Sequence, residues 1–319
     1  MVQNLLDPVI IFFLMGVVAC LLRVSLSIHQ VIYETISVYL LLALGLKGGY
    51  ELTQIRGGIF GMPLLGALVV GVTIPILAFF LSSKFKRFSR EDAVALAAHY
   101  GAASAVTFAV VLNYLEDLGF AHENFFTLFL VVIEVLGIFT AFSFLHLKRS
   151  QMGSALKNII HDVLLNKSIF LMLIGIVIGW VSSVNGFQHV KIVFIDLFKG
   201  VLCFFMLEMG LVCGLQIQKI RKNAGFILGF GLAMPLLAAT LATFIGWGVG
   251  LSVEGTAILS TIAASASYIA APVVSRSILP HANLAIPLIC TLGVTFPFNV
   301  LFGIPLYHSL ARSVHGLLG

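Results

Sequence analysis

Apolar positions along the chain are grouped into long runs, and polar positions are confined to short stretches between them. A run of about 20 apolar residues is long enough to cross the roughly 30 Å hydrocarbon core of a membrane as a helix. The pattern therefore predicts an all-α polytopic membrane protein. We expect ten transmembrane helices, at residues 8–28, 29–46, 58–83, 91–115, 124–147, 168–187, 193–216, 224–249, 253–279 and 284–311.

A hydrophilic interior segment, KRSQMGSALKNIIHDVLLNKS at residues 148–168, separates five of these spans from the other five. Three stretches recur in the same order on both sides of it. They are GLKGGYELTQIR at 45–56 and GLVCGLQIQKIR at 210–221, MPLLGA at 62–67 and MPLLAA at 234–239, and EDAVALAAHYGAASAVTFAVV at 91–111 and EGTAILSTIAASASYIAAPVV at 254–274.

This repetition predicts three parts: a first five-helix repeat (1–147), a cytoplasmic linker (148–167) and a second five-helix repeat (168–319). Because five is an odd number, the second repeat enters the membrane from the opposite side. A 5+5 inverted repeat is typical of secondary transporters, whose binding site lies at the midplane where the repeats meet.

Small residues, hydroxyls and a proline occupy the centres of the fourth and ninth spans. The two sequences are AAHYGAASAVT at 97–107 and STIAASASYIAAP at 260–272. Pro272 suits the first turn of a restarted helix, and Ser and Thr can bond freed backbone groups. We therefore expect broken helices four and nine, whose half-helix N-termini would attract a small anion. Close helix packing through small residues is the alternative interpretation.

Charge is sparse and unevenly distributed: 10% of residues are charged and 60% are hydrophobic. All but five of the 18 Lys and Arg residues fall in the predicted loops after odd-numbered spans. The positive-inside rule then places both termini outside the cytoplasm of a plasma (inner) membrane protein. This topology accounts for the sequence pI of about 9.1, so no nucleic-acid partner is expected.

The sequences GAASAVTFAVVLNYLED, AASASYIAAPVVSRSILPHAN and IYETISVYLLLALGLKGGYEL make the chain resemble the sodium-dependent bicarbonate transporter family of cyanobacteria. The likeness covers most of the chain, although the linker is shorter than in cyanobacterial members. It implies two crossed broken helices at the substrate site, symport of bicarbonate with sodium, and a homotrimer. It also implies a PII-like regulatory protein as a partner on the cytoplasmic face.

The resemblance also implies site residues by position. Ser104, Ala105 and Thr107 fall in the family's serine-rich break in span four. Ser265, Ala266 and Ser267 fall in the corresponding run in span nine, where Tyr268 stands at the position of a family aspartate. We expect these residues to bind the substrate, and sodium to use Thr107 and Ser267, with Ser104 and Tyr268 contributing to ion coupling. The missing aspartate leaves proton coupling as the alternative.

Two carboxylates lie inside apolar spans, Glu134 in LFLVVIEVLGIF and Glu208 in CFFMLEMGLVCG. Charged groups in a membrane are costly and usually functional, so Glu134 is a candidate for ion coupling. A hydrogen-bonded structural role is the alternative for Glu134. His99 could relay protons, although a packing histidine fits the same sequence.

No nucleotide-binding, zinc-binding or nucleophile–base pattern occurs, so we expect a gradient-driven carrier and not an enzyme. The predicted function is sodium-dependent bicarbonate uptake. The alternatives are a carrier for another small anion, driven by protons or sodium, a passive channel, and a non-transporting membrane receptor with the same fold.

Overall fold

A computed structural model describes residues 6–24, 26, 29–53, 61–85, 88–145, 161, 165–182, 184–219, 224–279 and 281–318. Most of the predicted linker at 148–167 lies outside these residues. Every regular element in the described part is helical. The elements are α2 (Pro8–Leu21), α3 (Gln30–Thr53), α4 (Gly61–Ser83), α5 (Arg90–Gly101), α6 (Ala105–Asp117), α7 (Phe126–Ser143), α9 (Lys167–Val181), α10 (Val184–Lys191), η1 (Ile192–Asp196), α11 (Phe198–Ile217), α12 (Ala224–Gly248), α13 (Val253–Ala264), α14 (Ala270–Ile278), α15 (Ala285–Cys290), η2 (Thr291–Thr295), α16 (Phe296–Phe298), η3 (Asn299–Gly303) and α17 (Ile304–Leu318).

Polar residues mark where several of these helices begin. Asp7 caps α2 through a bond from the Val9 amide, and Ser252 caps α13 through a bond from the Gly255 amide. At α5, Ser89 and Asp92 form a reciprocal capping box. Such caps satisfy amides that have no partner within the helix, so these helix starts are encoded locally.

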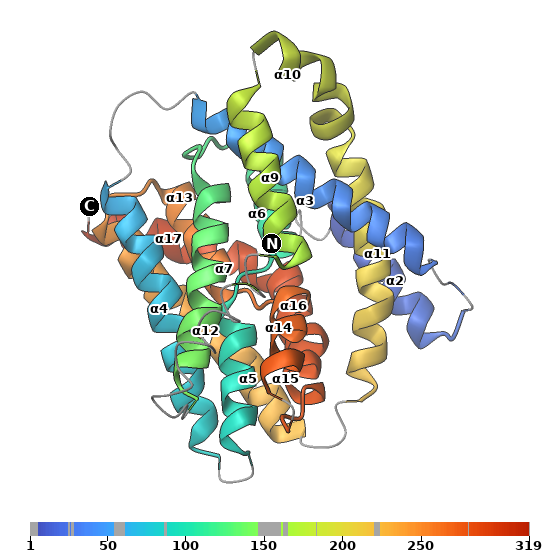
Figure 1. The fold of residues 1–319 in the computed structure, drawn as a ribbon, viewed down its shortest axis with the longest axis vertical. Coiled ribbons are helices and arrows are strands. Elements are labelled where there is room, and N and C mark those ends of the chain that lie inside the picture. The colour runs from blue at the N-terminus through green and yellow to red at the C-terminus, as the bar shows by residue number, and fades with distance from the viewer. Residues whose placement is uncertain are drawn as a thin grey trace.

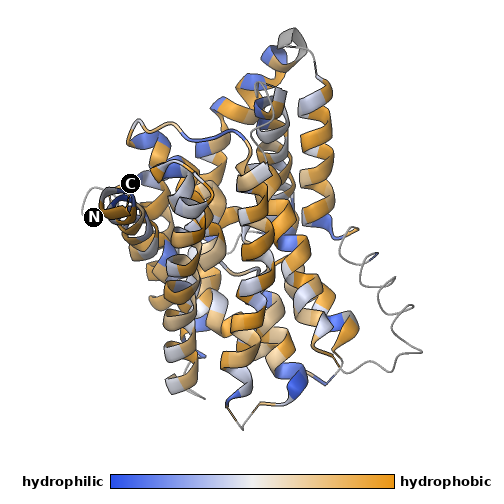
Figure 2. Ribbon diagram, turned by 90° about the vertical axis from the view of Figure 1, so that its left-hand side faces the viewer, coloured by the Kyte–Doolittle hydropathy of each residue, from blue (hydrophilic) through white to orange (hydrophobic). Residues whose placement is uncertain are grey.

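Six helical segments among the described residues are long and apolar enough to cross a membrane: Gln30–Thr53, Gly61–Ser83, Arg90–Asp117, Phe126–Ser143, Ala224–Gly248 and Ala285–Leu318. Three shorter apolar helices, Pro8–Leu21, Lys167–Val181 and Val253–Ala264, lie in other predicted spans. Figure 2 shows hydrophobic residues along most of the length of the helices. The protein is thus an all-helical membrane protein, and the full set of ten spans stays a prediction.

The helices pack as two groups, which we call the side bundle and the central bundle. In the side bundle, α2 packs on α11 and α3 packs on α9. In the central bundle, α4 packs with α5 and α7, while α13 packs with α12 and α17. Figure 1 shows α2 and α11 on one flank of the molecule and α4 on the other.

Glycines allow the two closest helix crossings of the side bundle. A Cβ built at Gly16 of α2 would lie 3.0 Å from the Gly210 Cα of α11 and would overlap the Leu207 carbonyl. At the other crossing, a Cβ at Gly45 of α3 would lie 2.9 Å from the Gly175 Cα of α9. Close backbone approach through small residues is a common mode of helix association in membranes.

Two helices of the central bundle, α5 and α13, are buried over most of their length. All residues from Ala93 to Gly101 in α5 and from Gly255 to Ala264 in α13 are buried. Alanine, glycine and hydroxyl residues predominate in both segments, so neighbouring helices can surround them closely. The C-terminal ends of α5 and α13 therefore lie inside the protein.

Candidate functional site

The chain leaves helical geometry between α5 and α6. Helix α5 ends at Gly101, residues 102–104 are extended or bent, and α6 begins at Ala105. Ser104 is the N-cap of α6, and its hydroxyl accepts a bond of 3.2 Å from the Thr107 amide. The interruption therefore has its own cap, although it lies in the interior.

A longer interruption separates α13 from α14. Helix α13 ends at Ala264, and α14 begins at Ala270 with Pro272 in its first turn. Proline suits this position because the first amides of a helix have no partner within that helix. The Ser267 hydroxyl accepts a bond of 3.3 Å from the Ala271 amide, so it caps the new helix from outside.

The two interruptions bind each other directly, and we call the place where they meet the crossing. The Ser104 amide donates to the Ser265 hydroxyl at 2.9 Å, and the Ser267 amide donates to the His99 carbonyl oxygen at 2.7 Å. The Ser265 hydroxyl also donates to the Ile262 carbonyl oxygen at 2.7 Å. Backbone groups freed at one interruption are thus satisfied by the other, as buried backbone requires.

A cavity lies beside this crossing, between the central and side bundles. Its volume is about 30 Å³ for the centre of a water-sized sphere, which corresponds to about two waters. We call it the inner cavity. The central bundle contributes Ala103, Ser104, Ala105, Val106, Ala109, Glu134, Ser267, Tyr268 and Ile269, and the side bundle contributes Ser37, Leu40, Leu41, Leu44, Ser168, Leu202 and Phe205. A cavity of this size suits a small ion better than a large organic molecule.

The structure brings five of the expected site residues to this cavity and places three behind it. Ser104, Ala105, Glu134, Ser267 and Tyr268 belong to the lining. Thr107, Ser265 and Ala266 are buried nearby but are not part of the lining. The hydroxyl of Ser265 is already engaged by the crossing, so its described contacts are structural.

Glu134 is the one charged residue of the lining. Its side chain comes from α7, and the residue is only 3% exposed. Among the described residues that line the cavity, none is a Lys, Arg or His that could balance a negative charge. An isolated buried carboxylate is costly, so Glu134 has to be protonated or accompanied by a cation.

Tyr268 brings a hydroxyl to the same cavity. Its ring packs edge-on against Phe296, with centroids 5.5 Å apart. The hydroxyl is buried beside the Ser104 side chain, and no hydrogen bond of good geometry engages it in the described part of the chain. A phenol held in this way can donate to an anion or accept from a protonated partner.

The side-bundle residues of the lining were not predicted from sequence. Ser37 and Ser168 supply hydroxyls from α3 and α9, and Phe205 supplies an aromatic wall from α11. The other two polar candidates lie elsewhere. Glu208 is on α11 outside the lining, and the His99 ring donates to the Ala95 carbonyl oxygen at 2.7 Å.

A family model described as the Na+-dependent bicarbonate transporter superfamily matches residues 8–312. The chain belongs to this superfamily. A search among curated proteins finds no match. Family membership makes the protein a membrane transporter and not an enzyme.

In this transporter the ends of the crossed helices are also fastened to each other. Glu123, which follows α6, accepts from the Ser252 amide at 2.7 Å and from its hydroxyl at 2.9 Å. At the opposite ends, Glu91 accepts from the His281 amide at 3.1 Å and Asp92 from the Asn283 amide at 2.7 Å. The crossing is therefore held at its centre and at both of its ends.

Proposed function

We propose that the protein is a secondary active symporter that takes up a small anion, and that bicarbonate driven by sodium is its substrate. The observation that carries this proposal is the inner cavity at the crossing, where Ser104, Ser267 and Tyr268 hydroxyls meet one carboxylate, Glu134. Hydroxyl donors and the N-terminus of α6 suit an anion. The family match supports bicarbonate as the anion.

In this proposal, the transport of the anion is coupled to that of a cation because their charges must balance inside the inner cavity. Glu134 and a bound anion would repel each other across a cavity of this size, which has no basic residue in its lining. A cation on Glu134 removes the repulsion, so the anion and the cation bind together. Sodium prefers oxygen ligands, and Glu134 with the Ser267 and Ser104 hydroxyls offers them, with Thr107 as a further candidate.

A specific observation favours the second candidate, a proton-coupled carrier. Tyr268 occupies the position at which the resembled family has an aspartate, so Glu134 is the one carboxylate of the cavity. A single buried carboxylate can neutralise itself by taking a proton, without needing the several oxygens that a metal ion requires. A receptor that binds the anion without transport is a third reading of the same cavity.

The inverted repeat is part of this proposal, and the side bundle supports it. The first helix of each half packs on the second helix of the other half, α2 on α11 and α9 on α3. Both crossings use a pair of glycines, Gly16 with Gly210 and Gly175 with Gly45. Two halves related by an axis in the membrane plane would produce this exchange.

The same proposal includes both termini outside the cytoplasm, residence in the plasma membrane, a homotrimer and a PII-like partner on the cytoplasmic face. The first follows from the distribution of Lys and Arg, and the second from the resemblance to the transporter family. The last two follow from the family resemblance alone.

Uptake of labelled bicarbonate into proteoliposomes tests the function. We expect accumulation under an inward sodium gradient, loss of most uptake in Ser267→Ala, and normal uptake in Ser275→Ala. Ser275 is a matched control because it is buried on α14 but does not line the cavity.

Three other results would change the proposal. Accumulation under a proton gradient alone would select the proton-coupled carrier. Flux of a different small anion would replace bicarbonate, and saturable binding without any flux would select the receptor.

A further inference from the structure

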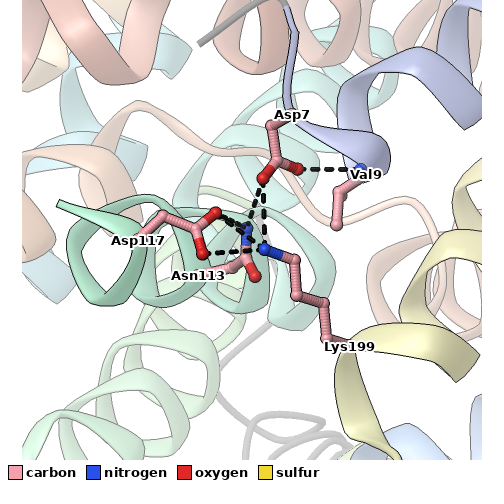
Figure 3. A network of polar contacts seen from close by, with 5 residues as sticks. All are labelled: Asp7, Val9, Asn113, Asp117 and Lys199. Carbon is pink, nitrogen blue, oxygen red and sulfur yellow. Dashed lines mark hydrogen bonds and ion pairs between the residues drawn. The ribbon is translucent and has the colours of Figure 1, made fainter. Parts of the chain in front are cut away.

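A network of polar and charged side chains joins the side bundle to the central bundle (Figure 3). Lys199, on the first turn of α11, places its Nζ 2.7 Å and 2.8 Å from the two carboxylate oxygens of Asp117, the last residue of α6. The same Nζ lies 3.2 Å from Oδ2 of Asp7, which caps α2. We call these residues, with Asn113, the outer network.

Asn113 completes the outer network from the central bundle. Its Nδ2 lies 3.1 Å from Asp117 Oδ2 and 3.5 Å from Asp7 Oδ2, so the amide bridges the two carboxylates. Burial raises the pKa of the Asp7 carboxyl above its ordinary value, while the charge of Lys199 acts against this rise. Lys199 thus holds together two carboxylates that would otherwise repel each other.

The outer network borders a second cavity, which we call the outer cavity. Its volume is about 300 Å³ on the same measure as the inner cavity. Asn113, Asp117 and Lys199 belong to its lining, and α3 and η1 supply other walls. The ion pair between α6 and α11 therefore bridges two elements that surround this cavity.

Leu44 and Ala109 line both cavities, so these two side chains lie between them. Both are almost fully buried, at 3% and 2% exposed. The inner cavity extends the other way, toward Ser37 and Ser168 near the starts of α3 and α9. The outer network thus lies on one side of the Leu44–Ala109 constriction, and the inner cavity lies on the other.

Little else ties α6 to the side bundle near this point, because α6 packs mainly on α13. Another ion pair of the side bundle makes no link to the central bundle. It joins Lys167, at the start of α9, to Glu34 of α3 at 3.8 Å, and both residues belong to the side bundle. Among the ion pairs of the described residues, the one that joins the two bundles is the pair of Lys199 with Asp117.

From this geometry we propose that the outer network is a latch that holds α11 against α6 and keeps the outer passage to the inner cavity closed. The proposal rests on the proposed transport function for its purpose, but its test does not require a substrate. Opening the latch lets the side bundle separate from α6, so the constriction at Leu44 and Ala109 becomes accessible from outside.

Labelling of a cysteine at the constriction tests the latch. Ala109→Cys is made together with Cys20→Ser, which removes the one native cysteine that is not buried. Right-side-out vesicles are treated with a membrane-impermeant maleimide. Lys199→Gln and Asp117→Asn should each raise the labelling rate about fivefold, the factor that corresponds to an ion pair worth about 1 kcal/mol.

Two features of the result separate a latch from general loosening. The double variant should label no faster than Lys199→Gln alone, because that substitution already removes the contact between Lys199 and Asp117. Lys167→Gln, the matched control, should leave the rate unchanged, and Lys199→Arg should keep it low.

Unchanged or slower labelling in Lys199→Gln would overturn the latch, as would additive effects or an equal effect of Lys167→Gln. A protein that transports nothing but shows the expected labelling would overturn the proposed function and leave the latch standing.

Discussion

Gly16 shows how much a single residue can control the side bundle. A methyl group at this position would overlap the Leu207 carbonyl and press on the Gly210 backbone. We expect Gly16→Ala to destabilise the protein by about 1–3 kcal/mol, since backbone cannot yield as a flexible side chain can. The midpoint of thermal unfolding in detergent measures the effect.

Gly229→Ala is the control for this prediction. Gly229 lies inside α12, and a Cβ there would have no atom within 4 Å. This substitution should leave the unfolding midpoint unchanged or raise it, because alanine favours helix more than glycine does. Equal losses in the two variants would contradict the close crossing.

Glu134 is the residue on which coupling depends in our proposal. Glu134→Gln removes the charge and keeps the shape, so the anion no longer needs a cation beside it. We expect exchange of anion across the membrane to persist while accumulation driven by a cation gradient falls at least tenfold. Counterflow and gradient-driven uptake in the same proteoliposomes measure the two activities.

The control for this second prediction is Glu208→Gln. Glu208 is an intramembrane carboxylate outside the cavity lining, so its neutralisation should leave the ratio of the two activities unchanged. Loss of exchange and accumulation in equal proportion in Glu134→Gln would indicate a structural role for that residue.

At the scale of elements, the crossing of the two interrupted helices depends on Ser265. Its hydroxyl accepts from the Ser104 amide, and no other bond of that amide is present in the described structure. Ser265→Ala should therefore cost about 1–3 kcal/mol of stability, the cost of leaving a buried amide without an acceptor. Ser313→Ala, at an exposed position of α17, should cost little.

The crossing also shows what sequence could and could not predict. Local patterns at Ser104 and Pro272 predict breaks in spans four and nine, and in the structure α6 begins at Ala105 and α14 at Ala270. These patterns could not distinguish Ser267, which lines the cavity, from Ser265, whose hydroxyl forms hydrogen bonds with backbone groups. That distinction depends on how two segments more than 150 residues apart face each other.

The side-bundle wall of the cavity was missed for a related reason. Ser37 lies among other hydroxyl residues of α3, such as Thr35 and Tyr39, and Ser168 is the one hydroxyl residue of α9, so local sequence does not mark either serine as part of a site. Their place at the cavity results from the packing of α3 on α9. Fold class and membrane residence, in contrast, follow from apolar run length, which is a property of each segment alone.

At the scale of the whole molecule, the proposed orientation has a direct test. A C-terminal alkaline phosphatase fusion should be active, because that enzyme matures outside the cytoplasm, and a fusion after Arg90, which keeps the basic residues 84–90, should be inactive. The reason is that the Lys and Arg residues following Ser83 favour the cytoplasmic side. The reverse pattern of activities would invert the orientation and place the outer network inside the cell.

The exchanged packing of the side bundle has a consequence for biosynthesis. Helices α2 and α3 are made early, but their partners α11 and α9 follow more than a hundred residues later. At a ribosomal rate of about 5–20 residues per second, the two early helices remain without these partners for roughly five seconds or more. A nascent chain of this kind needs an insertion machinery that shelters them until the second half arrives.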